Sequence, residues 1–222
     1  MAEIDTTQDR RCRGRPQVRP DDETRQIIYE AARHEFAASG YAATSMEAVA
    51  RRAGVSTKTL YRLVPNKASL FEGMVSDRLD RFLANLNLRA VDNVRIEEAL
   101  YAALMACAEL VLDEEVIALQ RMVLQEACKS SNIAGIFYRN GVQRTAAALA
   151  GWLRVQKKRG LIELDDVNEA AGMLIGMVAS APQRAAIFGG LPLPSRSEIE
   201  TRVRTCAGLF LWGCQAKRSS GQ

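Results

Sequence analysis

Residues Thr44–Phe71 read TSMEAVARRAGVSTKTLYRLVPNKASLF and predict two short helices joined by a tight turn. Thr44 and Glu47 have the spacing of a capping box, in which each side chain satisfies a free backbone N–H at a helix start. Apolar residues then recur at helical spacing. Gly54 should end this helix, because glycine adopts the left-handed conformation without a steric penalty. Ser56 is expected to cap the second helix.

The second helix carries polar side chains on its exposed side, with Leu60 facing inward. Short hydroxyls, cations and a phenol suit contacts with base edges and phosphates in a DNA major groove. We therefore interpret the two helices as a helix-turn-helix, although a glycine between short amphipathic helices also occurs in proteins that do not bind DNA. Bases should be read by Thr57, Lys58 and Thr59, phosphates should be held by Thr44, Tyr61 and Lys67, and Ser56 and Arg62 complete the expected DNA-binding set.

The same stretch resembles the DNA-binding domain of the TetR family of bacterial transcriptional regulators. The shared pattern is an opening Thr, an Ala-x-x-Ala-Gly-Val-Ser turn, Leu-Tyr, then Asn-Lys and Leu. In this chain these are Thr44, Ala50 with Ala53-Gly54-Val55-Ser56, Leu60-Tyr61, Asn66-Lys67 and Leu70. One departure is Leu63-Val64, where the family usually has His or Tyr followed by Phe. Leu63 cannot hydrogen-bond a phosphate.

Positive charge is concentrated around this stretch. The net charge is +4, from 30 Lys and Arg against 26 Asp and Glu. Residues 10–67 hold 12 Lys and Arg against 6 Asp and Glu, a balance of +6, whereas residues 68–222 balance at +1 and residues 1–9 at −3. The excess therefore lies where DNA phosphates would be bound, although a basic face without a partner is the simpler alternative.

Residues 1–20 are polar and rich in arginine, and we expect them to be disordered. Five arginines occur between Arg10 and Arg19, and Arg13 and Arg15 flank Gly14. Such a segment suits an A·T-rich minor groove, where the negative potential is enhanced. A merely solubilising tail is the alternative.

Several other classes of protein find little support. No apolar run approaches a membrane span, and the polar N-terminal segment lacks a secretory signal, so we expect a cytoplasmic protein without membrane contact. The five scattered cysteines and the single His34 predict no metal site or other cofactor, and the cysteines are expected mostly as small core residues. A redox role for Cys107 or Cys128 is the alternative. Without GxSxG or a glycine-rich phosphate loop, an enzyme is disfavoured.

The whole chain predicts an all-α fold of about nine helices. We expect an arm over residues 1–20, a helix-turn-helix domain over 21–66 and a helical ligand-binding and dimerisation domain over 67–222. The first helix should run from Asp21 to Gly40, and another should start at Lys67. Later helices are expected near 95–112, 114–129, 132–159, 166–188 and 196–215. Pro182 should kink or break the fourth of these, because it removes the bond to the Val178 carbonyl.

The last two helices carry narrow apolar seams. The spacing alternates between four and three residues, as in a coiled coil, so two copies would form a four-helix bundle, as the resemblance also implies. Ordinary packing within one chain is the alternative. The expected homodimer interface consists of Val167, Ala171, Leu174, Val178, Ala181, Ala185, Ile199, Val203, Cys206 and Phe210.

The resemblance also implies a pocket for a small-molecule inducer in the C-terminal helices. Methionines and aromatic residues suit an adaptable apolar pocket, and they suit a plain core as well. The expected pocket residues are Met105, Met122, Gln125, Glu126, Phe137, Tyr138, Trp152, Met173 and Met177, with Arg121 as a further polar anchor.

Together these features predict a dimeric, ligand-responsive transcriptional regulator, most simply a repressor, with a double-stranded DNA operator as its partner. An architectural DNA-binding protein without an inducer is the main alternative, and the sequence does not separate a repressor from an activator.

Overall fold

In the computed structural model of this protein, residues 19–88, 95–127 and 131–214 are described. They contain helices and no strand. The helices are α1 (Asp21–Ala43), α2 (Met46–Ala53), α3 (Thr57–Leu63), α4 (Lys67–Leu88), α5 (Ile96–Val111), α6 (Glu114–Ala127), α7 (Ser131–Phe137), the π-helix η1 (Tyr138–Gln143), α8 (Arg144–Lys158), α9 (Val167–Gly189) and α10 (Arg196–Cys214). Because α7, η1 and α8 run on without a break, the described residues form nine continuous helical segments. The predicted all-α fold is confirmed.

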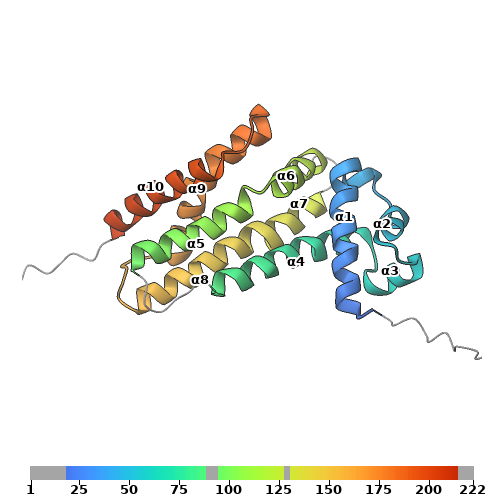
Figure 1. Ribbon diagram of the computed structural model, residues 1–222, viewed down its shortest axis with the longest axis horizontal. Coiled ribbons are helices and arrows are strands. Elements are labelled where there is room, and N and C mark those ends of the chain that lie inside the picture. Colours follow the sequence, from blue (N-terminus) through green and yellow to red (C-terminus); the bar gives the residue numbers. More distant parts are fainter. Residues whose placement is uncertain (1–18, 89–94, 128–130, 215–222) are drawn as a thin grey trace, which may run out of the picture.

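The helices are arranged in two groups along the molecule (Figure 1). α1, α2 and α3 lie together at one end, and α5, α8, α9 and α10 form the body, with α4 running from one group to the other. α6 and α7 lie where the groups meet, and α6 packs against α1. The end group is therefore attached to the body by α4 and through the contact between α1 and α6.

Two clusters of buried side chains follow this arrangement. The larger core joins the end of α4 to α5, α8, α9 and α10. The smaller core lies inside the α1–α4 group, around Phe36, Leu60 and Phe71. It also contains Met122 of α6 and Ile133 of α7, so the interior of the end group continues into the body.

The start of α2 differs from the prediction, and the expected capping box is wrong. The N-cap is Ser45, whose Oγ accepts the Ala48 N–H at 3.1 Å. Thr44 is only 3% exposed, and its hydroxyl donates inward to the carbonyl oxygens of Gly40 (2.7 Å) and Glu35 (3.1 Å). Thr44 therefore fixes the joint before α2. The predicted end of α2 is confirmed at Gly54, which has φ 65°. The predicted N-cap of α3, Ser56, is confirmed as well.

Pro182 neither breaks α9 nor leaves a carbonyl unpaired. α9 continues through Pro182 to Gly189. Proline has no N–H for the carbonyl of Val178, but Arg202 of α10 supplies one: its Nε donates to that oxygen at 2.8 Å. Arg202 also donates to the carbonyl of Met177, from Nη2 at 2.7 Å and from Nε at 3.0 Å. The donor missing in α9 is thus replaced by a side chain of the neighbouring helix.

Half of the apolar residues expected at the interface on α9 and α10 face inward, and this corrects the expectation for those residues. These five are buried in the larger core of the same chain: Ala171, Leu174, Val178, Val203 and Cys206. Val167, Ala185, Ile199 and Phe210 are partly buried, and Ala181 is exposed. The sequence analysis therefore identified the two amphipathic helices but placed five core residues in the interface with the partner subunit. The large apolar side chains exposed on these helices lie on the remaining surface: Met173, Phe188, Leu209 and Trp212.

We expect Arg202→Met to lower the free energy of unfolding by about 1–3 kcal/mol, because it leaves the Val178 carbonyl in the helix interior without a donor. In a Pro182→Ala background the loss should be smaller, because residue 182 then offers its own N–H to Val178. Urea unfolding at one fixed protein concentration would measure this coupling. The exposed Arg196→Met serves as the control, with little expected change. If Arg202→Met lowered the free energy of unfolding equally in the wild type and in Pro182→Ala, Arg202 would not be the donor that replaces the missing N–H of Pro182.

Candidate functional site

The outer face of α3 is polar and open to solvent. Thr57, Lys58 and Tyr61 are exposed, whereas Leu60 and Leu63 on the opposite face are buried in the smaller core. Lys58 has no hydrogen-bonding or ionic partner among the described residues. This helix therefore presents a hydroxyl, an ammonium group and a phenol outward, while its apolar side fixes its position.

The first turn of α3 is held by its own hydroxyls. The Oγ of Ser56 accepts the N–H of Thr59 at 3.0 Å, and the Ser56 and Thr59 hydroxyls are hydrogen-bonded to one another at 2.8 Å. Thr59 is half-buried and Ser56 is exposed. Of the three side chains expected to read bases, Thr57 and Lys58 are fully accessible, and Thr59 is partly committed to the helix cap.

Two further side chains of α3 are paired with acids of the same module. The Arg62 guanidinium forms two hydrogen bonds of 2.7 Å with the carboxylate of Asp21, at the start of α1. Hydrogen bonding from Arg62 lowers the pKa of the Asp21 carboxyl below its ordinary value. The Tyr61 hydroxyl donates to Glu47 Oε1 at 3.3 Å. Partial desolvation, and then the Glu47 carboxylate, raise the pKa of Tyr61, so the phenol stays protonated at neutral pH.

Lys67 lies inside the module instead of pointing into solvent. Its ammonium donates to the carbonyl oxygens of Tyr41 (2.8 Å), Thr44 (2.9 Å) and Ala42 (3.1 Å), and lies 4.8 Å from the centre of the Tyr41 ring. An ammonium group has three hydrogens to donate, and all three are used here. Thr44 likewise uses its hydroxyl internally. Both residues were expected to hold phosphates, and in this structure both hold the joint between α1, α2 and α4.

The departure at Leu63-Val64 has a structural reason. Both side chains are buried in the smaller core, where Leu63 is 8% exposed and Val64 2%. Their apolar character therefore suits packing under α3. α2 also exposes its N-cap Ser45 and Arg51, neither of which is among the DNA contacts expected from the sequence. Ser45 could have been found, because Thr44 and Ser45 are both good N-cap residues. The arm residues Arg13 and Arg15 lie outside the described part of the chain.

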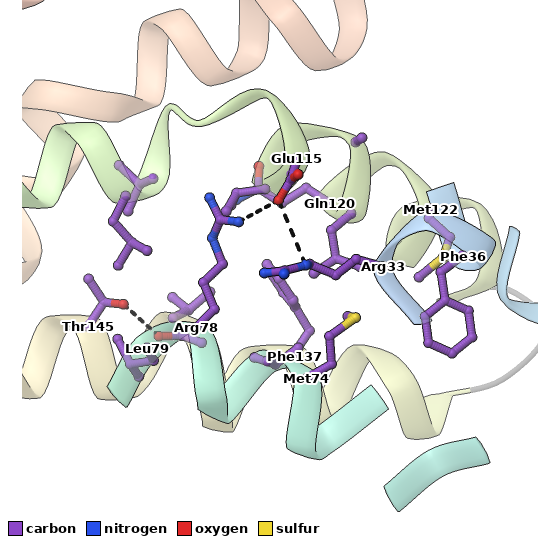
Figure 2. Close-up of a pocket in the computed structure, with 18 of the residues that line it drawn as sticks. Arg33, Phe36, Met74, Arg78, Leu79, Glu115, Gln120, Met122, Phe137 and Thr145 are labelled. Carbon is purple, nitrogen blue, oxygen red and sulfur yellow. Dashed lines mark hydrogen bonds and ion pairs between the residues drawn. The ribbon is translucent and has the colours of Figure 1, made fainter. Parts of the chain in front are cut away.

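A cavity of about 260 Å³ lies where the end group meets the body. Its walls come from α1, α4, α5, α6, α8 and α9 and from the segment around Phe137 and η1 (Figure 2). They are mostly apolar, and this volume is close to the lower end of the range typical for small-molecule sites. The apolar lining includes Phe36, Met74, Leu79, Leu119, Met122 and Phe137.

One part of the cavity wall is charged. Arg33 of α1, Arg78 of α4 and Glu115 of α6 point toward one another there (Figure 2). Arg78 Nη1 lies 2.6 Å from Glu115 Oε2, and its Nη2 lies 2.6 Å from Asp113 Oδ1. Burial lowers the pKa of Arg33 from its ordinary value, which marks a partly desolvated cation. Gln120, Thr145 and Gln183 add neutral polar groups to the wall.

Only two of the residues expected in the pocket line this cavity, namely Met122 and Phe137. The others lie elsewhere. Met105 is buried in the larger core, Trp152 packs against that core, and Met177 lines a shallow groove between α9 and α10. Gln125, Tyr138 (55% exposed) and Met173 (59% exposed) face solvent, and Glu126 and Arg121 do not line the cavity. The residues missed come mainly from α1, α4 and α6, and local periodicity does not show that these three helices meet.

The chemistry of the remaining candidate groups is limited. Cys107 is buried, and burial raises the pKa of its thiol to about 12, so almost no reactive thiolate forms near neutral pH. Cys128, Cys12 and Cys214 lie outside the residues whose side chains are described. In the described part of the chain, no three His, Cys, Asp or Glu side chains gather as a metal site would require. Among the described helices, none combines the length and the apolar character that a membrane span requires.

The arrangement defines a transcriptional regulator with a helix-turn-helix DNA-binding module. Residues 28–74 match the N-terminal domain of the bacterial regulatory proteins of the tetR family. Residues 98–213, more than half of the chain, match the C-terminal domain of AefR-like transcriptional repressors. The chain therefore belongs to the TetR family, whose members are typically DNA-binding repressors.

Solved structures agree with this assignment. A TetR-family regulator from Mesorhizobium loti MAFF303099 is 27% identical, with a TM-score of 0.76 over 89% of this chain and 99% of the other. The flavonoid-responsive regulator FrrA is 26% identical, with a TM-score of 0.65 over 88% and 99%. A regulator from Pseudomonas syringae pv. tomato DC3000 is 26% identical, with a TM-score of 0.64 over 87% and 97%. No curated protein sequence matches the chain significantly.

The two lysines of the module should behave differently when each is replaced by methionine. Lys67→Met should lower the free energy of unfolding by about 1–3 kcal/mol, because three carbonyls lose a charged donor. Lys58→Met should leave stability within about 0.5 kcal/mol, because Lys58 is exposed and unpaired. On DNA, Lys58→Met should weaken binding to a specific duplex more than binding to a shuffled one, because Lys58 is expected to read bases, and Lys67→Met should leave the slope of log affinity against log salt unchanged.

Thermal unfolding and fluorescence anisotropy at several salt concentrations would measure the two effects. A reduced salt slope with unchanged stability for Lys67→Met would contradict the internal role and restore Lys67 as a phosphate contact.

Proposed function

We propose that this protein is a homodimeric repressor that is released from a roughly palindromic operator when a small amphipathic inducer binds. The observation that carries the proposal is the exposed polar face of α3, supported from below by buried Leu60 and Leu63. A helix of this kind, placed second in a helix-turn-helix, enters the major groove. The charge balance of +6 over residues 10–67 favours the same surface.

The proposed DNA contacts are the polar side chains in and next to α3 that are accessible to solvent. We assign base reading to Thr57 and Lys58, with Thr59 beside them, and backbone contacts to Ser56, Tyr61 and Arg62. Arg62 would exchange Asp21 for a phosphate at little cost, because both side chains are about half exposed. Thr44 and Lys67 are left out because their donors are used internally. The division into an arm (1–20), a reading domain (21–66) and a helical domain (67–222) belongs to the same proposal, with Arg13 and Arg15 entering the minor groove.

Dimerisation is proposed through the solvent-facing side of α9 and α10. Phe188 is 74% exposed, Leu209 65% and Trp212 83%, which is unusual for side chains of this size in a monomer. A two-fold pair of these surfaces would present two α3 helices to successive major grooves, so that the operator is roughly palindromic. Two reading helices also raise specificity far above that of one.

Control by a ligand is proposed through the cavity between α1, α4 and α6. Its mostly apolar wall and few polar groups suit a small amphipathic molecule. FrrA, described as flavonoid-responsive and 26% identical, favours an aromatic ligand with polar substituents. The inducer must bind more tightly to a dimer whose α3 helices are wrongly spaced for DNA, because a ligand shifts an equilibrium only through different affinities for its two states.

The regulator should bind DNA upstream of its own gene at least roughly a thousandfold more tightly than a shuffled duplex of the same composition. Fluorescence anisotropy with the purified full-length protein, at two salt concentrations, would measure both affinities. The shuffled duplex is the control for binding to phosphates alone. Equal and steeply salt-dependent affinities for the two duplexes would contradict a specific repressor at that site and favour the architectural alternative.

Leu209→Glu should dissociate the dimer, because a carboxylate on the proposed interface would be buried without a partner. Leu124→Glu on α6 is the matched control, since Leu124 is also exposed (48%) but lies outside the proposed interface. Light scattering coupled to size exclusion would give the mass of two chains for the wild type and the control and of one chain for Leu209→Glu. A dimer in all three proteins would place the interface elsewhere.

A further inference from the structure

The charged part of the cavity wall is built around one carboxylate oxygen. Glu115 Oε2 lies 2.6 Å from Arg78 Nη1 and 4.0 Å from Arg33 Nε. Figure 2 shows the three side chains converging from α4, α6 and α1. Two cations from different helices therefore share one anion at the edge of an otherwise apolar cavity.

These three groups differ in their freedom to move. The side chains of Arg33 and Arg78 are 15% and 23% exposed, whereas that of Glu115 is 55% exposed. Glu115 can therefore rotate into solvent at small cost, but the arginines cannot leave with it. Without Glu115, two poorly solvated guanidinium groups would remain beside the cavity, and an incoming anion would be stabilised between them.

The arginines also have donors that Glu115 does not satisfy. Arg33 pairs with Glu30, and Arg78 pairs with Asp113, and neither of these acids lines the cavity. The Nε of each arginine is nevertheless buried and has no hydrogen-bond acceptor among the described residues. A buried N–H without an acceptor is costly. The single oxygen of Glu115 is thus an incomplete partner for two guanidinium groups that favour bidentate anions.

We propose that Arg33 and Arg78 form an anion subsite of this cavity, where the acidic end of an amphipathic ligand replaces the carboxylate of Glu115. This inference rests on the proposed function, because it specifies the ligand of the cavity proposed above. The ligand's apolar body would lie against Met74 and Phe137, and its carboxylate, sulfonate or phenolate would be held by both arginines. A cation would face two arginines there, and a neutral molecule would gain little from them.

The subsite also specifies how binding would reach the DNA-binding module. Arg33 belongs to α1, which packs against α2 and α3, and Glu115 belongs to α6 in the body. Replacing Glu115 by a ligand changes the ionic connection between α1 and α6. The ligand would therefore act directly on the first helix of the reading module.

The test uses two fluorescent probes with the same ring system, anilinonaphthalene sulfonate and the uncharged phenylnaphthylamine. The full-length wild-type protein should bind the sulfonate about tenfold more tightly than the neutral probe. Arg33→Met or Arg78→Met should abolish this preference. Arg81→Met is the matched control on α4, because Arg81 is half exposed, pairs with Asp77 and does not line the cavity. It should keep the preference.

A second pair of variants does not depend on replacing a buried arginine. Glu115→Gln removes the competing carboxylate and should raise the affinity for the sulfonate probe several-fold, without changing that for the neutral probe. Its neighbour Glu114 is exposed and does not line the cavity, so Glu114→Gln should change neither affinity. Thermal melts of all variants verify that each is folded.

The outcomes separate the subsite from the pocket itself. Ala118→Trp, which fills the cavity, should exclude both probes. Equal affinities of the two probes in the wild type, both abolished by Ala118→Trp, would overturn the anion subsite and leave the pocket in place. A sulfonate preference that survives in both arginine variants would also overturn it. If neither probe binds, or if Ala118→Trp has no effect on binding, the pocket fails and the subsite with it.

Discussion

The ammonium group of Lys67 holds together the part of the molecule on which DNA recognition depends. The last residues of α1, Tyr41–Ala43, follow a break at Gly40 (φ 77°, ψ 168°), so their carbonyl groups lie beyond the regular part of the helix. Lys67, the first residue of α4, donates to the carbonyls of Tyr41, Ala42 and Thr44. α2 begins directly after these carbonyls, so the direction of α2 and α3 depends on this group together with the Thr44 hydroxyl.

The same joint requires α1 and α4 to approach closely. Tyr29 of α1 lies against α4 at Gly73, where a Cβ atom would overlap the Tyr29 ring. Phe36, Tyr41 and Phe71 form a cluster of three aromatic rings beside it, with centroids 5.5 to 5.9 Å apart. Since interiors are close-packed, α1 cannot shift against α4 by small continuous steps. A movement of α1 must therefore carry the whole reading module.

The sequence predicted what depends on local patterns and missed what depends on contacts between distant segments. Helical periodicity, Gly54 and Ser56 specified the helix-turn-helix, because these signals act within one or two turns. The predicted cap of α2 is misplaced by one residue, because Thr44 and Ser45 are both common N-cap types and only Thr44 has a Glu three residues later. The seams of α9 and α10 were assigned to the partner because both sides of α9 carry apolar residues, and periodicity does not say which side meets the core. The roles of Lys67 and Arg202 were not predictable, because their acceptors are backbone carbonyls of other segments.

The cavity is where this rigidity could be used for regulation. Its wall includes residues of α1, so a bound molecule contacts the reading module without an intervening element. The smaller core joins α1 to α6 and α7 on one side of the joint, while the exposed Glu115 is the partner that Arg33 and Arg78 share across it. A packed apolar contact resists small displacements, whereas an ionic contact with one exposed partner is easily exchanged. A small molecule can therefore change the position of α1 most easily at the ionic contact of Arg33 and Arg78 with Glu115. The binding energy of a few polar contacts is enough there.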